Sequence, residues 1–152
     1  MGLLEDREDE MSRSGYSDDM DDPWALIRWR GAVTSAIRGK YGQAFLKEML
    51  AAMDALPEKK LIAHELQEYD DYGQPQFCAL GTVGKVRNID LSKLDPEDPE
   101  TVADVFGIPD ALAKEIVWTN DEGVGYWVKE IPEARFSRMR RWIESQIKET
   151  PK

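Results

Sequence analysis

The chain is short of the residues that most active-site chemistry requires. Its 152 residues include one cysteine, Cys78, and one histidine, His64. A single cysteine excludes an internal disulfide and fits a reducing cytoplasm, and a structural zinc site needs four Cys or His ligands. We therefore expect no metal site and no cofactor.

Long apolar runs are also missing. No stretch approaches the roughly 20 apolar residues that a membrane-spanning helix needs. The first residues lack the basic and apolar regions of a secretory signal. The sequence therefore predicts a soluble intracellular protein with no membrane partner.

The net charge of −10 is concentrated at one end of the chain. Residues 1–22 carry nine acidic side chains against Arg7 and Arg13, a net charge of −7, which leaves −3 for everything that follows. Acidic segments of this kind are typically disordered. We predict a disordered acidic tail over 1–21 and a single globular domain over 22–149. Imitation of nucleic acid by the tail is the alternative, and the acidic balance disfavours binding to nucleic acid itself.

The apolar pattern predicts a mostly helical α+β domain of about five helices with a small β-hairpin. Apolar residues recur with helical spacing at Leu26, Trp29, Val33, Ala36 and Ile37. This predicts a helix from Pro23 that ends at Gly39 and Gly42. A second helix over 43–56 should pack against it as an antiparallel αα-hairpin.

The turn-rich residues 70–75 predict a hairpin that pairs 62–68 with 75–78. A helix over 80–86 would pack closely through Gly81 and Gly84. Three more helices should begin near Glu100, at Pro109 and at Pro132. Their predicted inward residues are Val102, Val105, Phe106, Leu112, Ile116, Val117, Phe136, Met139, Trp142, Ile143 and Ile147.

The stretch 77–123, near the middle of the chain, contains a thiol and a polar cluster. Cys78, His64 and either Asn120 or Asp121 would supply the nucleophile, base and orienting group of a thiol hydrolase. The apolar neighbours of Cys78 favour a buried thiol instead. We therefore treat Cys78, Asn120 and Asp121 as a candidate pocket and assign no catalytic residue.

Aromatic and arginine residues are more numerous than a core of this size requires. Such residues are enriched in the parts of protein interfaces that carry most of the binding energy. The candidate partner-binding residues are Tyr126, Trp127, Trp29, Arg138 and Arg141. The plainer alternative is that the arginines pair with the acidic tail or with solvent.

Five segments together resemble a known group of proteins: 15–19, 29–33, 78–81 (Cys-Ala-Leu-Gly), 95–99 and 120–122 (Asn-Asp-Glu). Their arrangement is similar to that in a family of small uncharacterised proteins encoded by tailed bacteriophages and prophages. The resemblance implies a non-enzymatic accessory protein that binds a host protein in the bacterial cytoplasm, with inhibition of host defence as the leading role. A small-molecule or nucleotide binder and a Cys78-dependent hydrolase are the alternatives. The sequence leaves the oligomeric state open.

Overall fold

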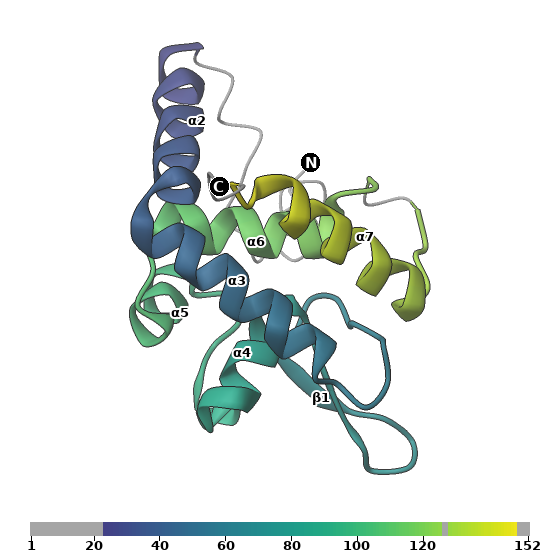
Figure 1. Ribbon diagram of the computed structural model, residues 1–152. Helices are drawn as coiled ribbons and strands as arrows, with labels where there is room; N and C mark the ends of the chain where they lie inside the picture. The colour runs from purple at the N-terminus through teal and green to yellow at the C-terminus, as the bar shows by residue number, and fades with distance from the viewer. Residues whose placement is uncertain (1–22, 126–127, 149–152) are drawn as a thin grey trace, which may run out of the picture.

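The computed structural model describes residues 23–125 and 128–148. Within them are six α-helices, one short 3₁₀ helix and a two-stranded antiparallel sheet, labelled as in Figure 1. The elements are α2 (Pro23–Arg38), α3 (Lys40–Asp54), β1 (Gln67–Tyr69), β2 (Pro75–Phe77), α4 (Ala79–Arg87), η1 (Leu91–Lys93), α5 (Pro99–Phe106), α6 (Asp110–Glu122) and α7 (Pro132–Gln146). The predicted class, a predominantly helical α+β fold, is confirmed.

Helix α3 lies at the centre of the molecule. It contacts α4 on one side and α7 on the other, and α6 contacts α2, α4, α5 and α7 (Figure 1). Leu46, Met49 and Met53 are spaced along one face of α3 and are fully buried. Because they meet Leu112 and Met139 in one continuous apolar cluster, burial of α3 holds the helices together.

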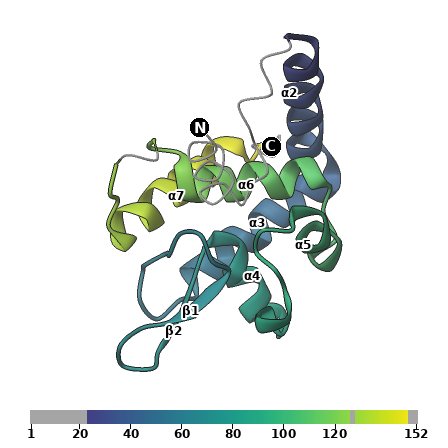
Figure 2. The same ribbon diagram turned by 180° about the vertical axis from the view of Figure 1, so that it is seen from behind.

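The expected αα-hairpin is wrong. Gly39 alone separates α2 from α3, and the two helices diverge from this corner instead of running antiparallel (Figures 1 and 2). Gly42 lies inside α3 and does not end a helix. A Cβ atom there would approach the carbonyl oxygen of Ala36 to 1.8 Å, so the corner requires glycine at this position.

The predicted β-hairpin is present but shorter than expected. Its pairs are Gln67 with Phe77, Glu68 with Gln76 and Tyr69 with Pro75. The amide of Ile62 donates to the carbonyl of Phe77 at 2.9 Å, so residue 62 is attached to the sheet without belonging to a strand.

Close packing through the glycines of α4 follows the sequence prediction. A Cβ atom on Gly81 would lie 2.0 Å from the carbonyl oxygen of Leu66, and one on Gly84 would lie 2.6 Å from the Leu91 side chain. Leu91 is itself buried in η1. The hairpin and η1 are therefore held directly against the backbone of α4.

The remaining helices begin close to the predicted places. Asp98 caps α5 by accepting from the amide of Thr101, and Gly107 follows its last turn with φ +70°. The predicted inward position of Val105 is wrong, because its side chain is exposed.

Candidate functional site

The candidate pocket residue Cys78 lies in the core and begins α4. Its side chain is 1% exposed, and its Sγ accepts a hydrogen bond from the amide of Gly81 at 3.3 Å. The thiol thus occupies the N-cap position and satisfies one of the open amides of the first turn. This arrangement gives the sulfur a structural role and no path to a substrate.

Asn120 is brought next to Cys78, as the sequence suggested, but its amide is fully engaged. It is 1% exposed. Its Oδ1 accepts from the amide of Ala79 at 3.1 Å, while its Nδ2 donates to the carbonyl of Ile62 at 2.9 Å and to Asp121 at 2.8 Å. One side chain therefore ties α6 to the start of α4 and to the segment before the hairpin.

Asp121 extends this network to His64. Its Oδ1 accepts from the backbone amide of His64 at 3.1 Å, and the imidazole Nδ1 lies 3.8 Å from Oδ2, beyond hydrogen-bond distance. His64 has φ +73°, a left-handed conformation that is uncommon outside glycine. Within residues 23–125 and 128–148, no hydrogen bond joins the imidazole to the Cys78 thiol. The three residues of the hypothetical hydrolase therefore do not form a relay.

Arg138 closes the carboxyl end of α6. Its guanidinium donates to the carbonyls of Thr119 at 2.7 Å and Asn120 at 3.0 Å, and to both carboxylate oxygens of Glu130, at 2.8 and 2.9 Å. A cation at this end complements the helix dipole and donates to carbonyls of the last turn, where Thr119 also accepts from the amide of Gly123 at 3.2 Å. The Arg138 side chain is only 17% exposed. The structure places this predicted partner-binding residue in an internal network.

Arg135 joins the same network from the first turn of α7. It donates to the carbonyl of Leu61 at 3.0 Å and to that of Glu130 at 3.2 Å. Desolvation lowers the pKa of its guanidinium, and the nearby carboxylate of Glu130 acts in the opposite direction. We call Asn120, Asp121, Glu130, Arg135 and Arg138 the polar junction, since they connect α6, α7 and the segment before β1.

The other predicted partner-binding residues lie elsewhere. Arg141 is exposed on α7. Trp29 is half-buried against the core, with the Lys114 ammonium 5.1 Å from the centre of its ring. Tyr126 and Trp127 lie outside the described residues, so their predicted exposure stays a prediction.

Sequence reasoning missed an exposed apolar surface on the first half of α2. Trp24 is 70% exposed and Ile27 is 61% exposed. Figures 1 and 2 show this half of α2 standing away from the body. Leu26 was expected to face the core and is in phase with buried Val33, yet it is exposed because α2 extends past the other helices. We call residues 23–31 of α2 the α2 arm.

The exposed side of the α2 arm has a regular spacing. Trp24, Ile27 and Gly31 stand at i, i+3 and i+7, which puts them on one face of the helix. A Cβ atom on Gly31 would meet nothing within 4 Å, so this face is open there. The signal in the sequence was the lack of acidic residues and the presence of Arg28, Arg30 and Arg38 in α2, next to a strongly acidic segment.

The described residues contain neither a metal-binding cluster nor a membrane-spanning helix. Over residues 23–125 and 128–148, no group of three or more His, Cys, Asp or Glu side chains could hold a metal ion. In the same part of the chain, no helix has the length and apolar character needed to traverse a bilayer.

Comparison with known proteins gives no family assignment. No protein-family model, no curated protein and no solved structure matches the chain.

Proposed function

We propose that this protein acts by binding a protein partner through the α2 arm, without turning over a substrate. The observation that carries the proposal is the exposure of Trp24 and Ile27 on a helix that projects from the body. A helix that presents apolar side chains at i and i+3 is suited to insertion into a groove on another protein. Tryptophan is among the residues that most often dominate such contacts.

The charge of α2 defines the kind of partner. The helix contains three arginines and no acidic residue, whereas the whole chain carries −10. A partner with an apolar groove bordered by carboxylates would match both the apolar face and the arginines, since complementary potentials steer encounter and exclude other partners. A second copy of the same helix would oppose arginine to arginine.

The resemblance to phage-encoded proteins motivates the biological setting. In that setting the partner is a host protein in the bacterial cytoplasm, and the proposed consequence of binding is inhibition of a defence or regulatory factor. The burial of Cys78 and the engaged amide of Asn120 favour this binding role over a hydrolase or a pocket at those residues.

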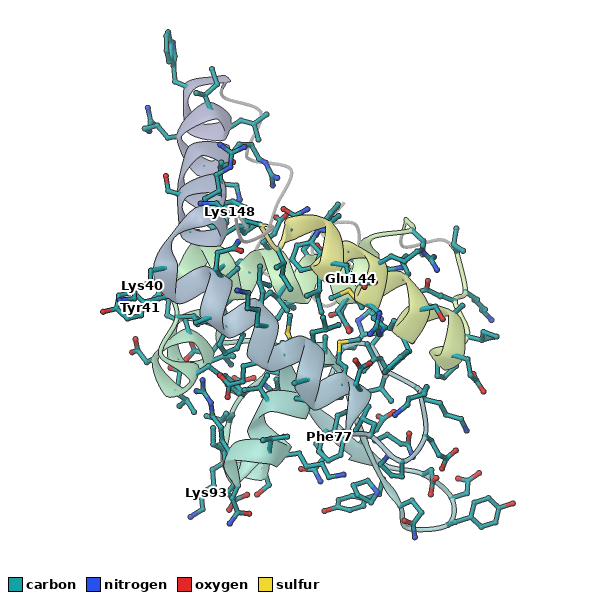
Figure 3. The ribbon with its side chains drawn as sticks, in the orientation of Figure 1. Lys40, Tyr41, Phe77, Lys93, Glu144 and Lys148 are labelled. Carbon is teal, nitrogen blue, oxygen red and sulfur yellow. The ribbon has the colours of Figure 1, made fainter. Side chains whose placement is uncertain are left out.

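The test is affinity capture from bacterial lysate followed by titration of the captured protein in purified form. The full chain serves as bait, beside a Trp24→Ala/Ile27→Ala variant. Tyr41→Ala is the matched control, because Tyr41 is exposed on α3, away from the arm (Figure 3). We expect the double variant to weaken the purified complex by at least about tenfold, equivalent to about 1.4 kcal/mol, with Tyr41→Ala unchanged.

A further variant, Trp127→Ala, compares the arm with the aromatic pair predicted from the sequence. Loss of binding in Trp127→Ala with full binding by the double variant would move the interface away from α2. Unchanged binding in every variant would overturn both assignments.

A further inference from the structure

A groove runs between α2 and the end of α7. Its volume is about 380 Å³, within the range typical of ligand-binding clefts. Val33, Ile37, Trp142 and Ile147 supply apolar side chains, and Arg30, Thr34, Arg38, Glu115, Ser145, Gln146 and Lys148 complete the lining. Trp24 and Ile27, the exposed apolar residues of the arm, are not among its lining residues.

Hydrogen bonds hold the two walls at a fixed distance. The Gln43 side chain donates to the carbonyls of Ile37 at 2.8 Å and Gln146 at 3.0 Å, and it accepts from the amide of Lys148 at 2.8 Å. One side chain thus fastens the end of α2 to the end of α7. The groove is consequently formed before any ligand enters, which lowers the entropic cost of binding.

The borders of the groove are cationic. Lys148 donates its ammonium to the backbone carbonyl of Arg38 at 2.7 Å, and both residues line the groove at the end of α2. At the other end Arg30 pairs with Glu115 at 3.0 Å. Three cations against one carboxylate give a net charge of +2, on a molecule that is otherwise acidic. An acidic peptide segment with some apolar side chains fits this combination.

The chain carries one such segment, and it is joined directly to α2. Residues 1–22 hold nine carboxylates against two arginines, together with Leu3, Leu4, Met11, Tyr16 and Met20. Twenty-two residues can span at most about 70 Å, whereas α2, with 16 residues, is about 24 Å long. The segment can therefore reach back along α2 from Pro23 to the groove. Covalent attachment would give it an effective concentration in the millimolar range.

We propose that the groove between α2 and the end of α7 binds the acidic residues 1–22 of the same chain. The carboxylates pair with Arg38 and Lys148, and an apolar side chain of the segment rests against Trp142 and Ile37. The groove shares Arg30 with the α2 arm, whereas the apolar contact proposed for the partner uses Trp24 and Ile27, which lie outside its lining.

The test uses the full chain with one spin label. Ser17→Cys carries the label in a Cys78→Ser background, in which the serine oxygen can still cap α4. We expect the amide signals of Thr34, Ser145 and Gln146 to lose intensity through paramagnetic relaxation. Lys93, far from Lys148 in Figure 3, should keep its signal. The signals should recover at about 1 M salt, where the Debye length falls to about 3 Å.

Charge reversal distinguishes binding of the acidic segment in the groove from its chance proximity to the groove. Arg38→Glu/Lys148→Glu should restore the groove signals, whereas Lys47→Glu/Lys93→Glu, an equal charge change at exposed sites away from the groove, should not. Replacement of the five acidic residues within 5–10 by their amides should restore them as well, and it leaves the folded helices untouched.

Three results would overturn the proposal. Groove signals that are unaffected by the label would show that the segment is not there. Groove signals that stay weak after both charge changes would show that the contact does not depend on charge pairing. Loss of signal in an isotope-labelled chain mixed with a separate spin-labelled chain would assign the groove to the segment of a second copy.

Discussion

The polar junction and the α2 arm use side chains that can form strong contacts in opposite ways. In the junction, Arg138 and Asn120 direct their polar atoms to backbone carbonyls, amides and carboxylates within the molecule. In the arm, Trp24 is 70% exposed and Ile27 is 61% exposed. Residue types that look functional in a sequence are thus used for folding in one region and presented at the surface in the other.

Burial explains the difference. The carboxyl end of α6 meets the start of α4 and of α7 inside the protein, so its carbonyls cannot be left to water and need internal donors. The first turns of α2 extend beyond the body and have no such demand. A polar cluster in a small helical domain can therefore indicate where helix ends meet. An exposed apolar helix face beyond the core can indicate where a partner binds.

The largest expected effect compares two arginines of α7. Arg138→Ala should lower the free energy of unfolding by about 3–5 kcal/mol, because it leaves the buried carboxylate of Glu130 without this partner. Arg141→Ala, one turn further along at an exposed position, should change it by less than about 0.5 kcal/mol. Urea denaturation of the three proteins measures both.

Equal effects of the two substitutions would erase the distinction between an internal and an exposed arginine. Arg138→Lys serves as a second variant, since it keeps the charge but loses the planar fork that reaches two carbonyls and a carboxylate. We expect its stability to fall between those of the wild type and Arg138→Ala.

Replacement of glycine by alanine should change the stability by less, and with opposite signs in α4 and in the α2 arm. Gly81→Ala should destabilise the protein by about 2 kcal/mol, because its Cβ would lie 2.0 Å from the backbone carbonyl oxygen of Leu66. Gly31→Ala in the arm meets nothing within 4 Å and should stabilise the helix by about 1 kcal/mol. Thermal and urea unfolding of both variants checks the signs. A destabilising Gly31→Ala would mean that the arm is packed against something and is not open.

The sequence predicted the elements better than their arrangement. Apolar spacing and helix-start signals located the six helices, and the turn-rich residues 70–75 located the hairpin. The corner at Gly39 was missed because the pattern of Gly39 and Gly42 fits two structures equally well. Such a pair can end a helix, or it can allow a close contact inside a helix. Only the approach of Gly42 to the Ala36 carbonyl decides between them.

The candidate site was harder to predict for a related reason. The sequence grouped Cys78 and Asn120 as a candidate pocket, but a sequence pattern does not specify whether a polar group faces a cavity or a backbone amide. Periodicity likewise put Leu26 on the inner face of α2, which is its correct phase, yet periodicity cannot tell how far a helix extends beyond the core that covers it.

The smallest expected effect concerns an ion pair outside the polar junction. It tests whether the stability of the junction depends on burial or on charge pairing alone. Glu48 on α3 pairs with Arg87 at the end of α4, at 2.7 and 2.8 Å, with both side chains partly exposed. The hydrogen bond from Arg87 lowers the pKa of Glu48 below its ordinary value of 4.5. A lowered carboxyl pKa contributes stability that is fully present above 4.5 and is lost as the pH falls through the folded-state pKa.

Glu48→Gln should therefore cost only about 0.2–1 kcal/mol at pH 7, and the difference from the wild type should vanish in acid. Urea denaturation from pH 7 down to pH 3 measures this, with Glu68→Gln, at an exposed position of β1, as the control. A loss at pH 7 as large as that expected for Arg138→Ala would show that charge pairing stabilises this fold equally inside and outside the junction. A small loss that disappears in acid would leave burial as the property that separates the two regions.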